Sequence, residues 1–156
     1  MRRNKLALYL HLVWATWDRL PLIKPEIERR LLRNIESEAQ GLGCKVLAIN
    51  STEDHVHVLL ALPTTIAIAN LVKQMKGVSS HFVNDEFNLE YQFKWQGSYG
   101  AFTVSRWDVD RIKQYVKCQK EHHATGELLQ EFEEVFEEIE LNRSGEESST
   151  QVDDRL

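Results

Sequence analysis

The sequence predicts an α+β protein, a ferredoxin-like split β-α-β sandwich, on three observations. Apolar residues alternate in some segments and recur every three or four residues in others. The segments follow in the order strand, helix, strand, strand, helix, strand, and two more helices, and the first six make the split β-α-β arrangement. A chain of 156 residues without internal repeats suits one domain. We expect an antiparallel sheet with helices on one face, the other face being left for chemistry or a partner, and extra C-terminal helices.

Four segments have the pattern of strands. Residues 5–16 alternate, with apolar side chains at every second position on one face. Residues 45–50 and 55–62 are apolar runs around the polar turn Ser-Thr-Glu-Asp, which predicts a β-hairpin. Residues 99–105 alternate again. The apolar face of the first strand contains Leu6, Leu8, Leu10, Leu12 and Trp14.

Two helices are predicted between these strands. Pro25 suits the first turn of a helix, and apolar residues then recur every four positions until Gly41 and Gly43 end it. A second helix follows Thr64 or Thr65 as a cap. The first buried stripe is Ile27, Leu31, Ile35 and Ala39; the second is Ile68, Leu71, Val72, Met75, Val78 and Phe82.

The C-terminal part is predicted to add two helices and a tail. Asp108 caps a third helix that points Val109, Ile112 and Val116 inward. A fourth helix is expected at about residues 127–140. After Leu141 the composition turns to Ser, Glu and Asp without periodicity, so we expect a folded domain at 1–141 and a disordered acidic tail at 142–156.

The charge is divided unevenly along the chain. The formal net charge is −5, but residues 127–156 contain 11 acidic and 2 basic side chains, whereas residues 1–126 contain 17 basic and 13 acidic ones. The acidic end therefore hides a mildly basic body. Because binding to phosphate depends on local positive charge, DNA or RNA is still a possible partner.

The sequence also indicates where in the cell the protein is expected. The sequence contains no apolar run of the roughly 18 or more residues that a membrane span needs. The apolar N-terminal segment carries His11 and lacks a small-residue cleavage site, so it is not interpreted as a signal peptide. Cys44 and Cys118 match no metal or disulfide spacing. We expect reduced thiols in a cytoplasmic protein.

The strongest local motif is the pair His55 and His57. Residues two apart in a strand point the same way, so both imidazoles leave one face about 7 Å apart along the backbone and can converge on one metal ion. The alternative is that two polar residues merely occupy the solvent-facing side of a half-buried strand. Taken alone, this short motif favours that alternative.

A second candidate is Tyr115 with Gln119 on the third helix. Four residues apart, the two side chains share a helix face, and the inward stripe occupies the neighbouring face, so Tyr115 need not be part of the core. The alternative is an amphipathic tyrosine at the edge of the core, which by itself is the commoner situation.

A third candidate lies on the second helix around Gly77. Lysines and hydroxyls beside a glycine that a backbone can approach are able to hold phosphates, and Arg111 adds positive charge close to Tyr115. A solvated helix face explains the same pattern equally well. The candidate DNA-binding residues are Lys73, Lys76, Gly77, Ser80 and Arg111.

Five sequence blocks together resemble one known family. They are HLVWAT (11–16), EDHVHVLLALP (53–63), LVKQMKGVSSHF (71–82), WQGSYGAFTVS (95–105) and YVKCQKEHH (115–123). In this order they resemble the HUH transposases with a single catalytic tyrosine, which serve small insertion sequences and include the REP-associated tyrosine transposases. The resemblance runs from about residue 10 to residue 136. Glu53 and Ser98 depart from its pattern, which bears on DNA preference rather than on chemistry.

The resemblance implies a function and a role for each candidate. It implies that His55, His57 and Gln119 bind a metal, Mg²⁺ or Mn²⁺, and that Tyr115 is the nucleophile. It implies cleavage and rejoining of single-stranded DNA at hairpin-bearing element ends through a 5′-phosphotyrosine. It also implies a homodimer in which the tyrosine helix of one subunit serves the histidine strand of the other, and a helix around Gly77 that lies close to DNA.

Two other functions are compatible with the same sequence. The first is a domesticated relative that holds hairpin DNA or RNA without cutting it; the intact set of His55, His57, Tyr115 and Gln119 argues against this reading. The second is a small ferredoxin-like regulator or hydrolase, which would have no use for Tyr115. A covalent protein–oligonucleotide adduct that depends on metal separates all three.

Overall fold

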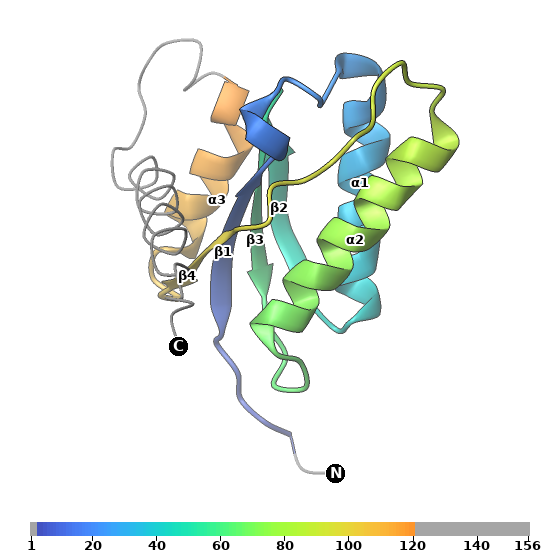
Figure 1. Cartoon of the computed structure of the whole chain (residues 1–156). Coiled ribbons are helices and arrows are strands. Elements are labelled where there is room, and N and C mark those ends of the chain that lie inside the picture. The colour runs from blue at the N-terminus through green and yellow to red at the C-terminus, as the bar shows by residue number, and fades with distance from the viewer. Residues whose placement is uncertain (1–2, 121–156) are drawn as a thin grey trace, which may run out of the picture.

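A computed structural model describes residues 3–120, which form one antiparallel sheet with helices on both sides (Figure 1). The strand order is β2-β3-β1-β4, the order of a ferredoxin-like sheet, and the predicted α+β class is confirmed. The predicted helix at 127–140, the domain limit at 141 and the acidic tail lie outside the described residues. The strands are β1 (Tyr9–Ala15), β2 (Lys45–Ser51), β3 (His55–Ala61) and β4 (Gly100–Val104).

Helices α1 (Pro25–Gly41) and α2 (Ile68–Glu86) cover one face of the sheet, as Figure 1 shows. The predicted stripe of α1 is buried in full, and it meets alternate residues of β1 and β3. The β1 side chains in this core are the expected Leu10, Leu12 and Trp14. This apolar layer holds the sheet and the two long helices together, because removal of such side chains from water is the dominant favourable term in folding.

The buried stripe of α2 is turned by about one residue from the predicted one. Ser79 and Val83 are buried, whereas Val78 and Phe82 are only partly covered. The reason lies in the segment that leads to β4, because the indole Nε1 of Trp95 donates a hydrogen bond of 3.0 Å to Ser79 Oγ. A buried hydroxyl with a specific partner has replaced the apolar contact that periodicity alone predicts.

The first strand is shorter than the sequence predicts. β1 begins at Tyr9, where its pairing with β3 and β4 begins. Leu6 and Leu8 lie before these pairs and are 48% and 43% exposed. Alternation therefore continues beyond the residues that have a neighbouring strand to pair with.

Helix α3 (Val109–Lys117) packs on the other face of the sheet, against β2 and β3 (Figure 1). Ile112 and Val116 contact Ala48 and Leu59 in a second, smaller apolar cluster. Asn50 Nδ2 also donates a hydrogen bond of 2.9 Å to the carbonyl of Lys117 at the end of the helix. The face that was expected to be free is therefore partly covered by the first of the extra C-terminal helices.

Within residues 3–120, no helix is long and apolar enough to cross a membrane. The two cysteines are both free thiols: Cys44 is buried and Cys118 is half-buried. Burial raises the pKa of the Cys44 thiol, which keeps it in the unreactive protonated form.

Candidate active site

The two histidines of the motif lie side by side on β3, on the face that α3 covers. Their ring centroids are 5.1 Å apart and the rings are inclined by 70°. Both side chains are buried, so the solvent-facing position considered from sequence is wrong. β3 is an inner strand paired with β1 and β2, which fixes the direction in which His55 and His57 point.

His55 is held through its Nδ1 atom. Nδ1 lies 2.6 Å from Asp54 Oδ1 and 2.8 Å from Thr52 Oγ1. Burial raises the pKa of Asp54, but the hydrogen bond and charge of His55, the charge of Arg19 and the Thr52 hydroxyl outweigh it, so the net pKa is lowered. An ionised carboxylate only accepts hydrogen bonds, so His55 Nδ1 carries a proton toward Asp54, and Nε2 is the ring nitrogen left for a metal ion.

The turn that carries Asp54 is fixed by the chain after β1. The amide of Thr16 donates to the carbonyl of Asp54 at 2.8 Å, and the amide of Ile23 donates to the carbonyl of Glu53 at 2.9 Å. Arg19 has a positive φ of 49°, an uncommon conformation for a residue other than glycine. Its Nε lies 3.5 Å from Asp54 Oδ2. Residues 16–23 therefore orient the carboxylate that orients His55.

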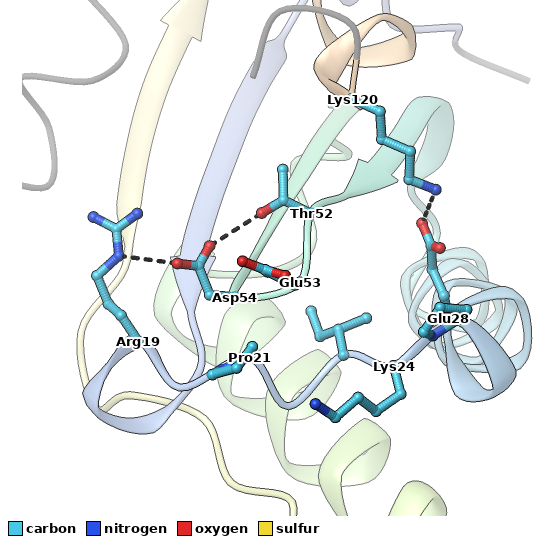
Figure 2. Close-up of a pocket in the computed structure, with 10 residues that line it drawn as sticks. Arg19, Pro21, Lys24, Glu28, Thr52, Glu53, Asp54 and Lys120 are labelled. Carbon is cyan, nitrogen blue, oxygen red and sulfur yellow. Dashed lines mark hydrogen bonds and ion pairs between the residues drawn. The ribbon is translucent and has the colours of Figure 1, made fainter. Parts of the chain in front are cut away.

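A pocket of about 560 Å³ opens behind this turn (Figure 2). Figure 2 shows two ion pairs at its rim: Arg19 with Asp54, and Lys120 with Glu28 at 2.5 Å. Since Lys120 directly follows Gln119, the second pair joins the end of the α3 region to α1. The pocket is thus lined by groups that steady both parts of the candidate site.

His57 is held by a residue to which the sequence analysis assigned no role. His11 lies on β1, is fully buried, and has its Nε2 2.9 Å from His57 Nδ1. Burial lowers the pKa of His11 to about 4, so its ring is neutral near pH 7. Its signal in the sequence was a histidine on the same strand face as Val13, inside an otherwise apolar strand.

Tyr115 lies against the histidines of its own chain. Its ring centroid is 6.0 Å from that of His57 and 6.4 Å from that of His11, with the rings edge to face in both pairs. Tyr115 is 3% exposed and belongs to the cluster under α3, so the position outside the core considered from sequence is wrong. The buried face of α3 consists of Ile112, Tyr115 and Val116, whereas the sequence predicted Val109 in place of Tyr115.

Gln119 completes the group of side chains under α3. Its Nε2 donates a hydrogen bond of 3.4 Å to the carbonyl of Tyr115. Its Oε1 is buried and accepts no hydrogen bond within the described residues. A buried amide oxygen without a donor is costly, and a cation is one group that would satisfy it.

Within residues 3–120, no group of three or more His, Cys, Asp and Glu side chains could hold a metal. The candidate ligands His55, His57 and Gln119 fall outside that definition, because the third ligand is an amide. Coordination by His55 and His57 would use Nε2, since both Nδ1 atoms are hydrogen bonded to protein. The orphaned amide oxygen of Gln119 fits a divalent cation that accepts nitrogen and oxygen ligands.

Two of the candidate DNA-binding residues of α2, Lys73 and Gly77, line an open groove. The groove has a volume of about 480 Å³ and runs beside Lys73 and Gly77. A Cβ on Gly77 would meet no atom within 4 Å, so the glycine is not required by packing inside the chain. Ser80 is partly covered and its hydroxyl donates to the carbonyl of Gly77 at 3.1 Å.

Lys76 and Arg111 have partners inside the chain. Lys76 Nζ donates to the carbonyls of Gln96 and Ser98, which ties α2 to the loop before β4. Burial lowers the pKa of Lys76 to about 8. Arg111 lies 3.8 Å from Asp108 and is 60% exposed. Both remain predicted DNA contacts, and for Lys76 a structural role is visible as well.

One exposed aromatic was missed by the sequence analysis. Trp107, just before α3, is 79% exposed, and the guanidinium of Arg106 lies 4.2 Å from its ring centroid. By contrast Trp95, in the segment before β4, is buried. Trp107 lies in a turn between a strand and a helix, where no periodic pattern predicts exposure. The only sequence signals for a binding role were its large ring and the adjacent Arg106.

Comparison with protein families shows the class to which this chain belongs. The family model described as "Transposase IS200 like" matches residues 4–119. The chain therefore belongs to the IS200-like transposase family, whose members cut and transfer DNA, and the resemblance seen in the sequence is confirmed.

Two curated transposases are similar in sequence to this chain. The transposase of insertion sequence IS200 from Salmonella typhimurium is 25% identical over 124 residues, covering 76% of this chain and 81% of the relative. The ISDra2 transposase TnpA of Deinococcus radiodurans is 28% identical over 117 residues, covering 72% and 84%.

Two solved structures have the same fold. One, described as a transposase from Deinococcus radiodurans, has a TM-score of 0.60 and 27% identity, covering 76% of this chain and 96% of the other. The other is a REP-associated tyrosine transposase bound to a REP hairpin, with a TM-score of 0.59 and 13% identity, covering 79% and 74%.

Proposed function

We propose that this transposase cleaves and rejoins single-stranded DNA through a covalent bond to Tyr115, with a divalent metal held by His55, His57 and Gln119. The observation that carries the proposal is the contact between α3 and β3. The Tyr115 ring lies 6.0 Å from His57 in the same chain, although 58 positions separate the two in sequence. Nothing in the apolar packing of α3 requires a tyrosine at this point, since its hydroxyl brings a polar atom into a buried cluster.

Tyr115 needs assistance as a nucleophile, because a phenol ordinarily titrates near pH 10 and a phosphodiester is anionic. Mg²⁺ or Mn²⁺, when bound, would offset charge on the phosphate oxygens beside the tyrosine. The protein's part is orientation: Asp54 and Thr52 fix His55, α3 carries Tyr115, and Gln119, just after the helix, donates to the carbonyl of Tyr115. Two imidazoles and an amide suit Mn²⁺ better than Mg²⁺.

The proposed step conserves the energy of the phosphodiester. The Tyr115 oxygen forms a bond to phosphorus and gives up its proton, while the bond from phosphorus to the 3′ oxygen breaks and that oxygen takes up a proton. The products are a 5′-phosphotyrosine and a free 3′ hydroxyl. Attack by another 3′ hydroxyl reverses these bond changes and rejoins DNA without ATP.

The proposed substrate is single-stranded DNA with a hairpin. The solved relative with a bound REP hairpin supports a hairpin ligand, and the open groove beside Lys73 and Gly77 gives a phosphate backbone a place to approach α2. We also propose a homodimer with shared active sites, as the sequence resemblance implies. The single chain already brings Tyr115 to its own His57, so a site within one subunit is the alternative arrangement.

The test is formation of a covalent adduct. A library of single-stranded hairpin oligonucleotides with randomised flanks, labelled at the 3′ end, is incubated with Mn²⁺ and run on a denaturing gel. We expect a slowly migrating protein–DNA band that maps to Tyr115 and is absent in Tyr115→Phe. That substitution removes one oxygen and keeps the ring, so folding and hairpin binding on a native gel should be preserved.

Tyr99→Phe is the matched control, because Tyr99 is a half-buried tyrosine just before β4. It should form the adduct like the wild type. Hairpin binding without any adduct in the wild-type protein would instead indicate a domesticated binding protein that does not cut. An adduct on another tyrosine would disprove the role given to Tyr115.

A further inference from the structure

His11 occupies a position that the proposed chemistry does not yet use. In the pairing of β1 with β3, His11 is opposite Leu59 and Val13 is opposite His57, so His11 and His57 are diagonal neighbours on one face. Diagonal pairs on an antiparallel sheet are within reach of ring side chains. The contact between the two histidines is therefore set by the register of the central strands.

The two rings meet edge to edge. Their centroids are 5.1 Å apart, the planes are inclined by only 23°, and His11 Nε2 lies 2.9 Å from His57 Nδ1. Rings stacked face against face would not bring two nitrogens to hydrogen-bond distance in this way. One ring donates an N–H to the other, and the donor depends on the tautomer of each ring.

We propose that His11 is a positioning residue for His57. His57 donates its Nδ1 proton to His11 Nε2, which keeps the Nε2 lone pair of His57 directed at the metal. This inference rests on the proposed function in one respect, that His57 binds metal through Nε2. Metal-binding histidines are commonly fixed by a hydrogen bond from the other ring nitrogen.

Two observations favour this role over that of a third ligand. His11, His55 and His57 do not form a cluster that could hold a metal, on a search of residues 3–120. The Nε2 atom of His11 is also engaged, since it lies at hydrogen-bond distance, 2.9 Å, from His57 Nδ1. The two proposed ligands are thus oriented by different chemistry: a carboxylate and a hydroxyl for His55, and a second imidazole for His57.

The first test reads the tautomers directly. Side-chain ¹⁵N NMR of the metal-free, full-length protein distinguishes a histidine protonated at Nδ1 from one protonated at Nε2, and His57→Gln assigns the signals of His57. We expect His57 to be protonated at Nδ1 in the wild type and to lose this preference in His11→Leu. A role that was only structural would leave the tautomer of His57 unchanged.

The second test measures Mn²⁺ affinity by titration in the absence of DNA. Loss of such an outer partner typically weakens metal binding by about 10- to 100-fold. We expect a loss in this range for His11→Leu and recovery of most of it in His11→Gln, whose amide again offers an acceptor at the end of the side chain. Phe102→Leu is the control, because it trims a side chain that lies beside the His11 ring while the hydrogen bond between His11 and His57 is kept.

The outcomes separate this inference from the proposed function. If wild-type protein binds no Mn²⁺, the proposed metal site fails, while the tautomer of His57 still decides whether His11 is its acceptor. Protonation of wild-type His57 at Nε2, or an unchanged tautomer and Mn²⁺ affinity in His11→Leu, overturns the role of His11. Should His11→Leu not fold, the wild-type tautomer and His11→Gln decide the same question.

Discussion

The two faces of the sheet are both buried, but they are built from different chemistry. The face under α1 and α2 is a continuous apolar layer, in which β3 contributes Val56, Val58 and Leu60. The face under α3 carries three histidines and a tyrosine beside a small apolar cluster. The same two strands, β1 and β3, supply both faces with alternate residues.

This difference separates two requirements. Apolar packing is roughly proportional to the area removed from water and has no direction, so it tolerates exchange among residues of similar volume. A buried polar group instead needs a partner at a particular distance and angle. The apolar face therefore determines whether the chain folds, whereas the polar face is expected to determine what the folded chain does.

The largest expected effect is on the polar face. In His57→Ala, Mn²⁺ binding and the covalent adduct should fall below detection. The free energy of unfolding should also fall, by about 1–3 kcal/mol, because His11 Nε2 is left buried without its partner. The measurements are the denaturing gel, an Mn²⁺ titration and urea unfolding.

Treatment of the wild-type protein with excess EDTA is a control that removes the metal without any change of residue. It should abolish the adduct, and an excess of Mn²⁺ should restore it. Adduct formed at the wild-type rate by His57→Ala, or in EDTA, would show that the polar face is not a metal site.

The next effect concerns the apolar face of the same strand. Leu60→Ala, three residues along β3, should lower the free energy of unfolding by about 2–5 kcal/mol, because it leaves a cavity in a fully buried position. The folded fraction should keep the Mn²⁺ affinity of the wild type. Altered affinity in folded Leu60→Ala protein would mean that the two faces are not separable.

The smallest effect lies outside the sheet, on α2. Gly77→Ala should stabilise the protein by about 0.5–1 kcal/mol, because Ala suits a helix interior better and its Cβ meets nothing within 4 Å. It should nevertheless weaken binding of hairpin DNA, if the groove beside Lys73 receives a phosphate backbone. The measurements are thermal unfolding and a native gel at fixed salt.

Gly41→Ala at the end of α1 is the matched control, since its Cβ would also meet no atom within 4 Å. It should leave DNA binding unchanged. Gly77→Ala that binds hairpins as tightly as the wild type would place the DNA elsewhere on the chain.

The apolar face could be predicted from sequence because its signal is local. Alternation in β1 and the four-residue spacing in α1 identify Leu10, Leu12, Ile27 and Leu31 as core without knowledge of any partner. The pair His55 and His57 was found for the same reason, since residues two apart in a strand share a face.

The polar partners could not be predicted, because they depend on contacts between distant segments. The contact of His11 with His57 follows from the register of two strands 46 positions apart. The burial of Tyr115 follows from the side of the sheet on which α3 packs, and an amphipathic pattern does not state which face a helix will cover. The burial of Ser79 was not predicted, because a buried hydroxyl has no apolar signal.

The central place of β3 also limits how its length can vary among relatives. All seven of its residues are paired with β1, and most of them with β2 as well, so the strand cannot slide past its neighbours. One inserted residue would turn both imidazoles into the apolar layer. Two would restore the face but carry the rings about 7 Å past His11. Alignments of the family should therefore run without gaps across residues 55–61, and insertions should collect in the turns on either side.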